Sequence, residues 1–123
     1  MQQQTDNFAK FGKSFQDSLC QLMLEDRPFC DQITEVLTID FLETKYLQVF
    51  VKTIMDYRTR YNVHPTYEIL ATIFKSGISE YDDGVQKQVR DYYARVIASD
   101  KVNDADYIKE TANDFCRKQV LKQ

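Results

Sequence analysis

Residues 43–61, ETKYLQVFVKTIMDYRTRY, decide the fold of this chain. Their apolar side chains recur at intervals of three and four positions, at Leu47, Phe50, Ile54, Tyr57 and Tyr61. This is the period of one face of an α-helix, whereas a half-buried strand would alternate at every second residue. The segment therefore predicts a central helix over 43–61 that turns one face to the core, with Ile54 near its middle.

Weaker segments of the same period on both sides predict further helices. They cover 14–25, 26–37, 66–75, 85–99 and the chain from 104 onward. Asp26 and Thr66 are expected to cap two of these helices, and Gly77 is expected to end one. The chain has only 3 Gly and 2 Pro, whereas sheet proteins need many turns. We therefore predict an all-α fold, a compact bundle of about six helices.

Composition narrows the class of protein. The chain is 43% hydrophobic and 28% charged, an ordinary globular mixture. Its net charge of −3 is spread evenly along the sequence, without the positive segment that tight nucleic-acid binding requires. Three widely spaced cysteines, Cys20, Cys30 and Cys116, match neither a disulfide framework nor a metal site. Buried reduced thiols in a reducing, intracellular compartment are expected.

Two short motifs suggest chemistry that the residues around them do not support. Gly12-Lys13-Ser14 looks like the end of a phosphate-binding loop, but Asn7 stands where that motif needs its first Gly. His64 is the only histidine, and no nucleophile or metal ligand lies at a defined spacing from it. We expect a helix N-terminus at the first motif and a turn at the second. No catalytic, cofactor-binding or metal-binding residue is predicted.

The segments 43–61 and 66–75 resemble a helix-turn-helix in outline. The second helix would have to contact DNA, yet it carries one basic and one acidic residue, so phosphate contacts would be scarce. Four tyrosines lie off the main apolar stripes, and each is expected either at a partly buried helix boundary or in a protein interface. They are Tyr46, Tyr67, Tyr81 and Tyr107.

Several strings occur in an order that resembles a known family. They include Phe15-Gln16, the run 19–24, Ile39-Asp40-Phe41, the run 64–70 (HPTYEIL) and the run 106–119, which ends in Phe-Cys-Arg-Lys-Gln. In this order the chain resembles the N-terminal domain of a DnaB-type replicative DNA helicase, in a bacteriophage version. The resemblance implies a helical bundle followed by a helical hairpin, which packs against copies of itself as a collar on a hexameric ring.

The resemblance also implies the organisation and role of the chain. Residues 1–13 would be a polar flexible N-terminus, 14–103 the helical bundle, and 104–123 the start of the hairpin. The last helix has no stop signal, so we expect a fragment cut within that helix. Its role would be non-catalytic oligomerisation and partner docking. ATP and Mg would belong to a separate motor domain of the parent helicase, and this chain would need no cofactor.

The partners expected from the resemblance are copies of the chain, as a weak dimer here and a hexamer in the parent, and a primase or helicase loader. Neither strong nucleic-acid binding nor a membrane is expected, and the location would be the cytoplasm of a bacterium or a phage-infected bacterial host. The interface candidates are Phe115, Val120 and Leu121, on an apolar edge of the last helix, and Tyr107, which lies off the main apolar stripe. A free-standing helical adaptor or regulator remains an alternative, as does a small helical DNA-binding protein. An enzyme is the weakest class.

Overall fold

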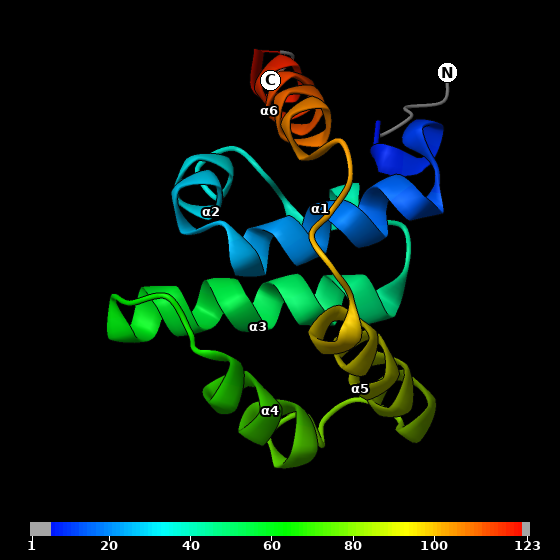
Figure 1. Cartoon of the computed structure of the whole chain (residues 1–123), viewed down its shortest axis with the longest axis vertical. Helices are drawn as coiled ribbons and strands as arrows, with labels where there is room; N and C mark the ends of the chain where they lie inside the picture. Colours follow the sequence, from blue (N-terminus) through cyan, green and yellow to red (C-terminus); the bar gives the residue numbers. More distant parts are fainter. Residues whose placement is uncertain (1–5, 122–123) are drawn as a thin grey trace. The chain divides into compact units, whose positions relative to one another are not determined.

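Helices form all the regular structure in the computed structural model of the chain, which describes residues 6–121 (Figure 1). The all-α prediction of six helices is confirmed. In chain order the elements are η1 (Phe8–Phe11), α1 (Lys13–Glu25), α2 (Arg27–Ile33), η2 (Ile39–Phe41), α3 (Lys45–Tyr61), α4 (Tyr67–Ser76), α5 (Asp83–Ala98) and α6 (Ala105–Leu121).

The predicted capping residues set the ends of the helices. The Asp26 carboxylate accepts a hydrogen bond from the Phe29 N–H at 3.0 Å and begins α2. The Thr66 hydroxyl accepts one from the Ile69 N–H at 3.1 Å and begins α4, which ends at the C-cap Gly77. These bonds satisfy backbone N–H groups that have no partner inside the helix.

The described chain divides into two compact units. The first contains 6–43 and 102–121, and the second contains 44–101. In the first unit, α1 packs against η1, α2 and α6. In the second, α5 packs against both α3 and α4.

An aromatic cluster fills one end of the first unit. The Phe8 ring lies 5.0 Å from that of Phe115 and 5.8 Å from that of Phe41, measured between ring centroids. Phe8 is fully buried within η1. The expectation of a flexible polar segment over 1–13 is therefore wrong for residues 8–11, because a phenylalanine there joins the core; residues 1–5 lie outside the described part.

A buried glutamine joins three segments of the same unit. The Gln16 amide nitrogen donates hydrogen bonds to the Glu43 carboxylate at 2.8 Å and the Gly12 carbonyl at 3.3 Å, with a longer one to the Phe8 carbonyl at 3.5 Å. Its carbonyl oxygen accepts one from the Glu43 N–H at 2.9 Å. Gln16 is only 1% exposed, and these bonds satisfy its polar atoms.

The second unit is built around α3. Phe50 packs against Phe74 of α4 and Tyr92 of α5, with ring centroids 5.6 Å and 5.0 Å apart, and Ile54 is fully buried. The predicted stripe ends there, because Tyr57 is half-buried and Tyr61 is 55% exposed. The last two turns of α3 therefore leave the core.

Two hydrogen bonds from α5 fix both ends of α4. The Tyr93 hydroxyl donates to the Tyr67 carbonyl at 2.6 Å, and the Arg90 guanidinium donates to the Phe74 carbonyl at 3.3 Å. Burial raises the pKa of Tyr93 to about 12, so this hydroxyl stays protonated and able to donate at neutral pH. The position of α4 beside α3 therefore depends on α5.

All three cysteines are buried, as predicted. Burial raises the pKa of the Cys20 thiol well above its usual value and that of Cys116 to about 12. The thiolate, which is the reactive form, is therefore suppressed at both positions.

Candidate protein-interaction surfaces

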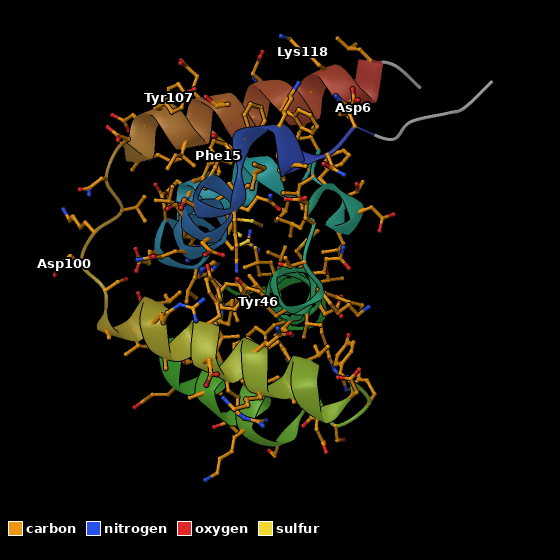
Figure 2. All side chains as sticks on the ribbon, turned by 90° about the vertical axis from the view of Figure 1, so that its right-hand side faces the viewer. Asp6, Phe15, Tyr46, Asp100, Tyr107 and Lys118 are labelled. Atoms are coloured by element: carbon orange, nitrogen blue, oxygen red, sulfur yellow. The ribbon has the colours of Figure 1, made fainter. Side chains whose placement is uncertain are left out.

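One long face of α6 carries exposed apolar side chains at both ends. Tyr107 (Figure 2) is 64% exposed, and Leu121 is 83% exposed. They lie fourteen residues apart, close to a whole number of turns of about 3.6 residues, so they share one face of the helix. Between them on this face, Asp114 and Lys118 form an ion pair at 3.1 Å. We call Tyr107, Asp114, Lys118 and Leu121 the α6 outer face.

The other two interface candidates do not belong to this face. Phe115 is 4% exposed and packs against Phe8 and Phe41, so its predicted place in an exposed interface is wrong. It occupies the core because its helical position coincides with that of Ile108 and Ala112, which are also buried. Val120 is 46% exposed but points to a different side of the helix from Leu121.

A hollow of about 310 Å³ lies beside α6 in the same unit. The Lys10 ammonium lies 5.4 Å from the Phe11 ring centroid and 5.2 Å from that of Phe115, within the range of cation–π attraction. The hollow is lined by Asp6, Lys10, Phe11, Thr111, Asp114, Phe115, Lys118 and Gln119. Both signs of charge are present, and the cations are already engaged by rings or by Asp114.

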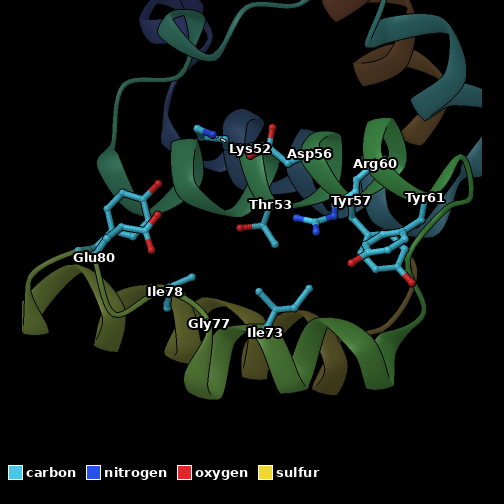
Figure 3. A pocket seen from close by; sticks show the side chains of 11 residues that line it. Lys52, Thr53, Asp56, Tyr57, Arg60, Tyr61, Ile73, Gly77, Ile78 and Glu80 are labelled. Atoms are coloured by element: carbon cyan, nitrogen blue, oxygen red, sulfur yellow. Dashed lines mark hydrogen bonds and ion pairs between the residues drawn. The ribbon is translucent and has the colours of Figure 1, made fainter.

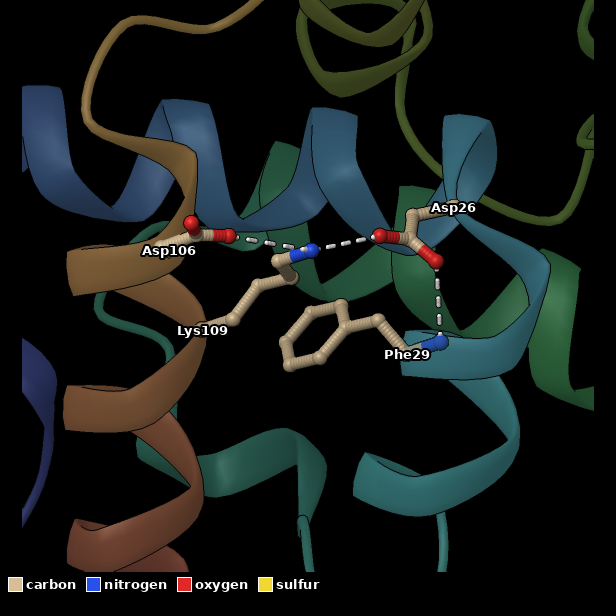
Figure 4. Close-up of polar contacts among 4 residues, drawn as sticks. All are labelled: Asp26, Phe29, Asp106 and Lys109. Atoms are coloured by element: carbon tan, nitrogen blue, oxygen red, sulfur yellow. Dashed lines mark hydrogen bonds and ion pairs between the residues drawn. The ribbon is translucent and has the colours of Figure 1, made fainter.

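A partly buried ion pair joins α6 to the start of α2 (Figure 4). The Lys109 ammonium donates to the Asp26 carboxylate at 2.8 Å and lies 3.7 Å from a carboxylate oxygen of Asp106. The hydrogen bond from Lys109 lowers the pKa of Asp26, and the bond from the Phe29 N–H adds to this. The same contact raises the pKa of Lys109. This pair holds α6 in place and is not a candidate site.

The second unit has a groove of about 300 Å³ between α3 and α4 (Figure 3). One wall is the C-terminal half of α3, and the other is the end of α4 with the segment 77–81. The Tyr57 and Tyr61 rings lie 4.7 Å apart at one end, and the floor includes Ile73 and Ile78. We call this the α3–α4 groove.

The charges around the α3–α4 groove are unevenly matched. Lys52 and Asp56 pair with one another at 2.7 Å. The Arg60 guanidinium lies 5.6 Å from the Tyr61 ring centroid and has no carboxylate partner among residues 6–121. Glu80 lies at the opposite end (Figure 3). The groove thus has a cationic aromatic end and an anionic end, with an apolar floor between them.

The four tyrosines expected off the main stripes have different surroundings. Tyr67 and Tyr107 are 47% and 64% exposed, and Tyr81 is half-buried at the α3–α4 groove. Tyr46 is buried, with its ring 5.6 Å from that of Tyr92, so it cannot serve an interface.

The α3–α4 groove was not predicted from the sequence. Its signal in the sequence is the pair Tyr57 and Tyr61, which continues the helical stripe beyond the last core residue.

The short motifs have the local structures expected from the sequence. Gly12-Lys13-Ser14 follows η1 and begins α1, with Gly12 at a φ of 90°. His64 lies in the turn after α3, where its Nδ1 is 2.7 Å from Nη1 of Arg58. Within residues 6–121, no three His, Cys, Asp or Glu side chains come together as a possible metal site. Nor does any helix in this range have the length and apolar character needed to cross a membrane.

We found no known protein that is significantly similar to this chain. No family model matches it, and no curated protein or solved structure matches it at a significant level.

Proposed function

We propose that this chain is a non-catalytic helical docking domain that associates with copies of itself through the α6 outer face. In the helicase family that the sequence resembles, this is the role of the N-terminal oligomerisation and partner-docking domain in DNA replication. The observation that carries the proposal is the exposure of Tyr107 and Leu121 on one face of α6. Tyrosine is enriched in protein interfaces, and exposed side chains near both ends of α6 would anchor both ends of a helix pair.

The spacing along α6 specifies how two copies would pair. A two-fold axis that crosses two antiparallel α6 helices near Asp114 places Tyr107 of each copy opposite Leu121 of the other. The same axis places Glu110 of each copy opposite Lys118 of the other, so the flanking charges attract. The Asp114–Lys118 pair partly neutralises the charge at the axis. A single helix pair buries little area, so the dimer should be weak and exchange rapidly with monomer.

Sedimentation velocity over a concentration series tests the self-association. The mass of the native chain should rise with concentration, and Leu121→Glu should shift it toward monomer. Ile97→Glu is the matched control, because Ile97 is an exposed isoleucine on α5, 52% accessible, where the same change should have no effect. A native chain that stays monomeric, or a Leu121→Glu variant that still dimerises, would contradict the proposal.

A charge exchange tests the antiparallel register. Glu110→Lys and Lys118→Glu should each weaken the dimer, because each places like charges opposite one another. The double variant restores opposite charges and should recover the native dimer. If the double variant is weaker than both single variants, the register is wrong.

The replisome role requires a separate measurement. We expect the purified chain to bind the primase or the helicase loader of its own replication system, measured by calorimetric titration. If it binds neither while self-association persists, a free-standing adaptor or regulator becomes the better description.

A further inference from the structure

We propose that the α3–α4 groove is a second docking site, which binds a protein segment carrying an acidic residue, an apolar anchor and a basic residue. This inference rests on the proposed docking function for its context. It concerns the other compact unit, however, and a different set of residues from the α6 outer face.

The shape and lining of the groove favour apolar side chains. At about 300 Å³ it lies at the lower limit of small-molecule pockets, which span about 300–1,000 Å³. Ile73 and Ile78 provide an apolar floor, and the paired rings of Tyr57 and Tyr61 form one end. Tyr61 is 55% exposed, so much of its ring is available to a partner. The groove therefore has room for an anchoring leucine or phenylalanine.

The charge of Arg60 indicates which residues a bound protein segment should carry. Arg60 has no carboxylate partner in the described chain and lies against the Tyr61 ring, which reduces its freedom before binding. A carboxylate of the bound segment would accept a pair of charge-assisted hydrogen bonds from the Arg60 guanidinium in bidentate geometry. At the other end, Lys52 is shared between Asp56, its ion-pair partner, and the field of Glu80, so this end keeps an excess of negative charge and favours a cation. Arginine and tyrosine are also, with tryptophan, the residues that most often dominate interface energies.

The same charges argue against nucleic acid as the occupant. Asp56 and Glu80 both line the groove and would repel phosphates, and Lys52 is already neutralised by Asp56. One unpaired arginine gives a single phosphate contact, whereas binding to single strands depends on a positive groove along the backbone. A protein segment with separated acidic and basic residues fits both ends of the groove.

The test is a titration of the full chain with a short blocked peptide, Glu-Leu-Phe-Lys, followed by two-dimensional NMR. Amide signals of Tyr57, Tyr61, Ile73 and Gly77 should shift. Its Gln-Leu-Phe-Gln analogue, which keeps the anchors and removes the charges, should bind at least tenfold more weakly. Arg60→Glu and Tyr61→Ala should each reduce the affinity of the charged peptide at least tenfold.

Arg95→Glu is the matched control, because Arg95 is also an exposed arginine over a tyrosine ring, 5.5 Å from the centroid of Tyr92, but lies outside the groove. It should bind the peptide as the native chain does, and so should Leu121→Glu, whose effect belongs to self-association. No shifts at millimolar peptide, shifts elsewhere, equal binding of the neutral analogue, or tighter binding of a single-stranded oligonucleotide would each overturn the proposal.

Discussion

One buried amide, that of Gln16, joins η1, the start of α1 and the segment before α3. Gln16→Leu keeps a similar size but leaves the Glu43 N–H, the Glu43 carboxylate and the carbonyls of Gly12 and Phe8 without these bonds. Each buried group that loses its partner costs about 1–3 kcal/mol. The exposed Glu43 can bond to water instead, so we expect urea unfolding to show a loss of stability at least as large as the cost of one such group. Gln88→Leu, on the exposed side of α5, should change stability little, and an equal loss there would contradict the explanation.

The Asp26 carboxylate has two separable roles, as the cap of α2 and as the partner of Lys109. Its folded-state pKa lies below the ordinary 3.8, so it stabilises the fold at pH values above 3.8. This contribution is lost as the pH falls through the lowered pKa. Asp26→Asn retains a capping oxygen but no charge, and should cost about 1 kcal/mol at neutral pH.

Thermal unfolding of the native chain and Asp26→Asn as a function of pH separates the two roles. The stability difference should be constant above about pH 5 and should disappear at low pH, where the native carboxyl is also protonated. Asp26→Ala removes the capping oxygen as well, so its free energy of unfolding should be about 1 kcal/mol lower than that of Asp26→Asn at every pH. A stability difference between native and Asn forms that persists below the lowered pKa would show that charge is not its cause.

Contacts between residues this far apart in the sequence cannot be predicted from the sequence pattern. Gln16 and Glu43 are 27 positions apart, and Asp26 and Lys109 are 83 apart. The prediction of Asp26 as a cap is correct, because a capping bond joins residues only a few positions apart in the sequence. Periodicity could not show that Phe8 joins the core, because η1 is a single short turn whose burial depends on Phe41 and Phe115.

At the scale of elements, α3 carries most of the packing of the second unit. Ile54 is fully buried, so Ile54→Asp would place a carboxylate in an apolar environment at a cost of several kcal/mol, comparable with the whole stability of a small domain. We expect circular dichroism to show a large loss of helix or a much lower melting temperature. Ile97→Asp, at a 52% exposed isoleucine of α5, should retain the native melting behaviour. Similar melting of both variants would contradict the central role of Ile54.

The same helix shows how far periodicity reaches. The predicted boundaries, 43–61, agree closely with α3, because the spacing fixes the phase and the left-handed Asn62 ends the helix. The pattern did not show where the apolar stripe leaves the core. Tyr57 and Tyr61 continue its spacing, but α4 lies so that they border a groove, and that position depends on the bonds from Tyr93 and Arg90.

At the scale of the whole molecule, the candidate surfaces were only partly predictable. Tyr107, predicted to lie off the apolar stripe, and Leu121, predicted on the apolar edge of the last helix, are exposed, whereas Phe115, predicted on the same edge as Leu121, is buried. Phase separates the two sides of a helix, but it does not say which side faces its own unit. The α3–α4 groove needs two helices and the segment 77–81 together, so no single stretch of sequence contains it.

The charge of the whole chain gives the last prediction, which separates a docking domain from a DNA-binding one. With 16 basic and 19 acidic residues, the chain lacks an excess of cations to displace the counterions of DNA. In a helix-turn-helix, α4 would be the helix that contacts the bases. Its charged residues are one basic, Lys75, and one acidic, Glu68. We expect fluorescence anisotropy to detect no duplex binding tighter than about 10 μM at physiological salt.

The salt dependence makes that measurement decisive. Non-specific binding through several phosphate contacts would strengthen by orders of magnitude between about 200 mM and about 50 mM salt, because each contact releases counterions. A chain that uses apolar and paired charged surfaces should show no such rise. Micromolar affinity at low salt that weakens steeply as salt is added, and weakens further in Arg58→Gln and Arg60→Gln, would identify the end of α3 as a phosphate-binding surface. Peptide docking in the α3–α4 groove would then give way to the DNA-binding alternative, because Arg60 cannot serve a phosphate and a partner carboxylate at once.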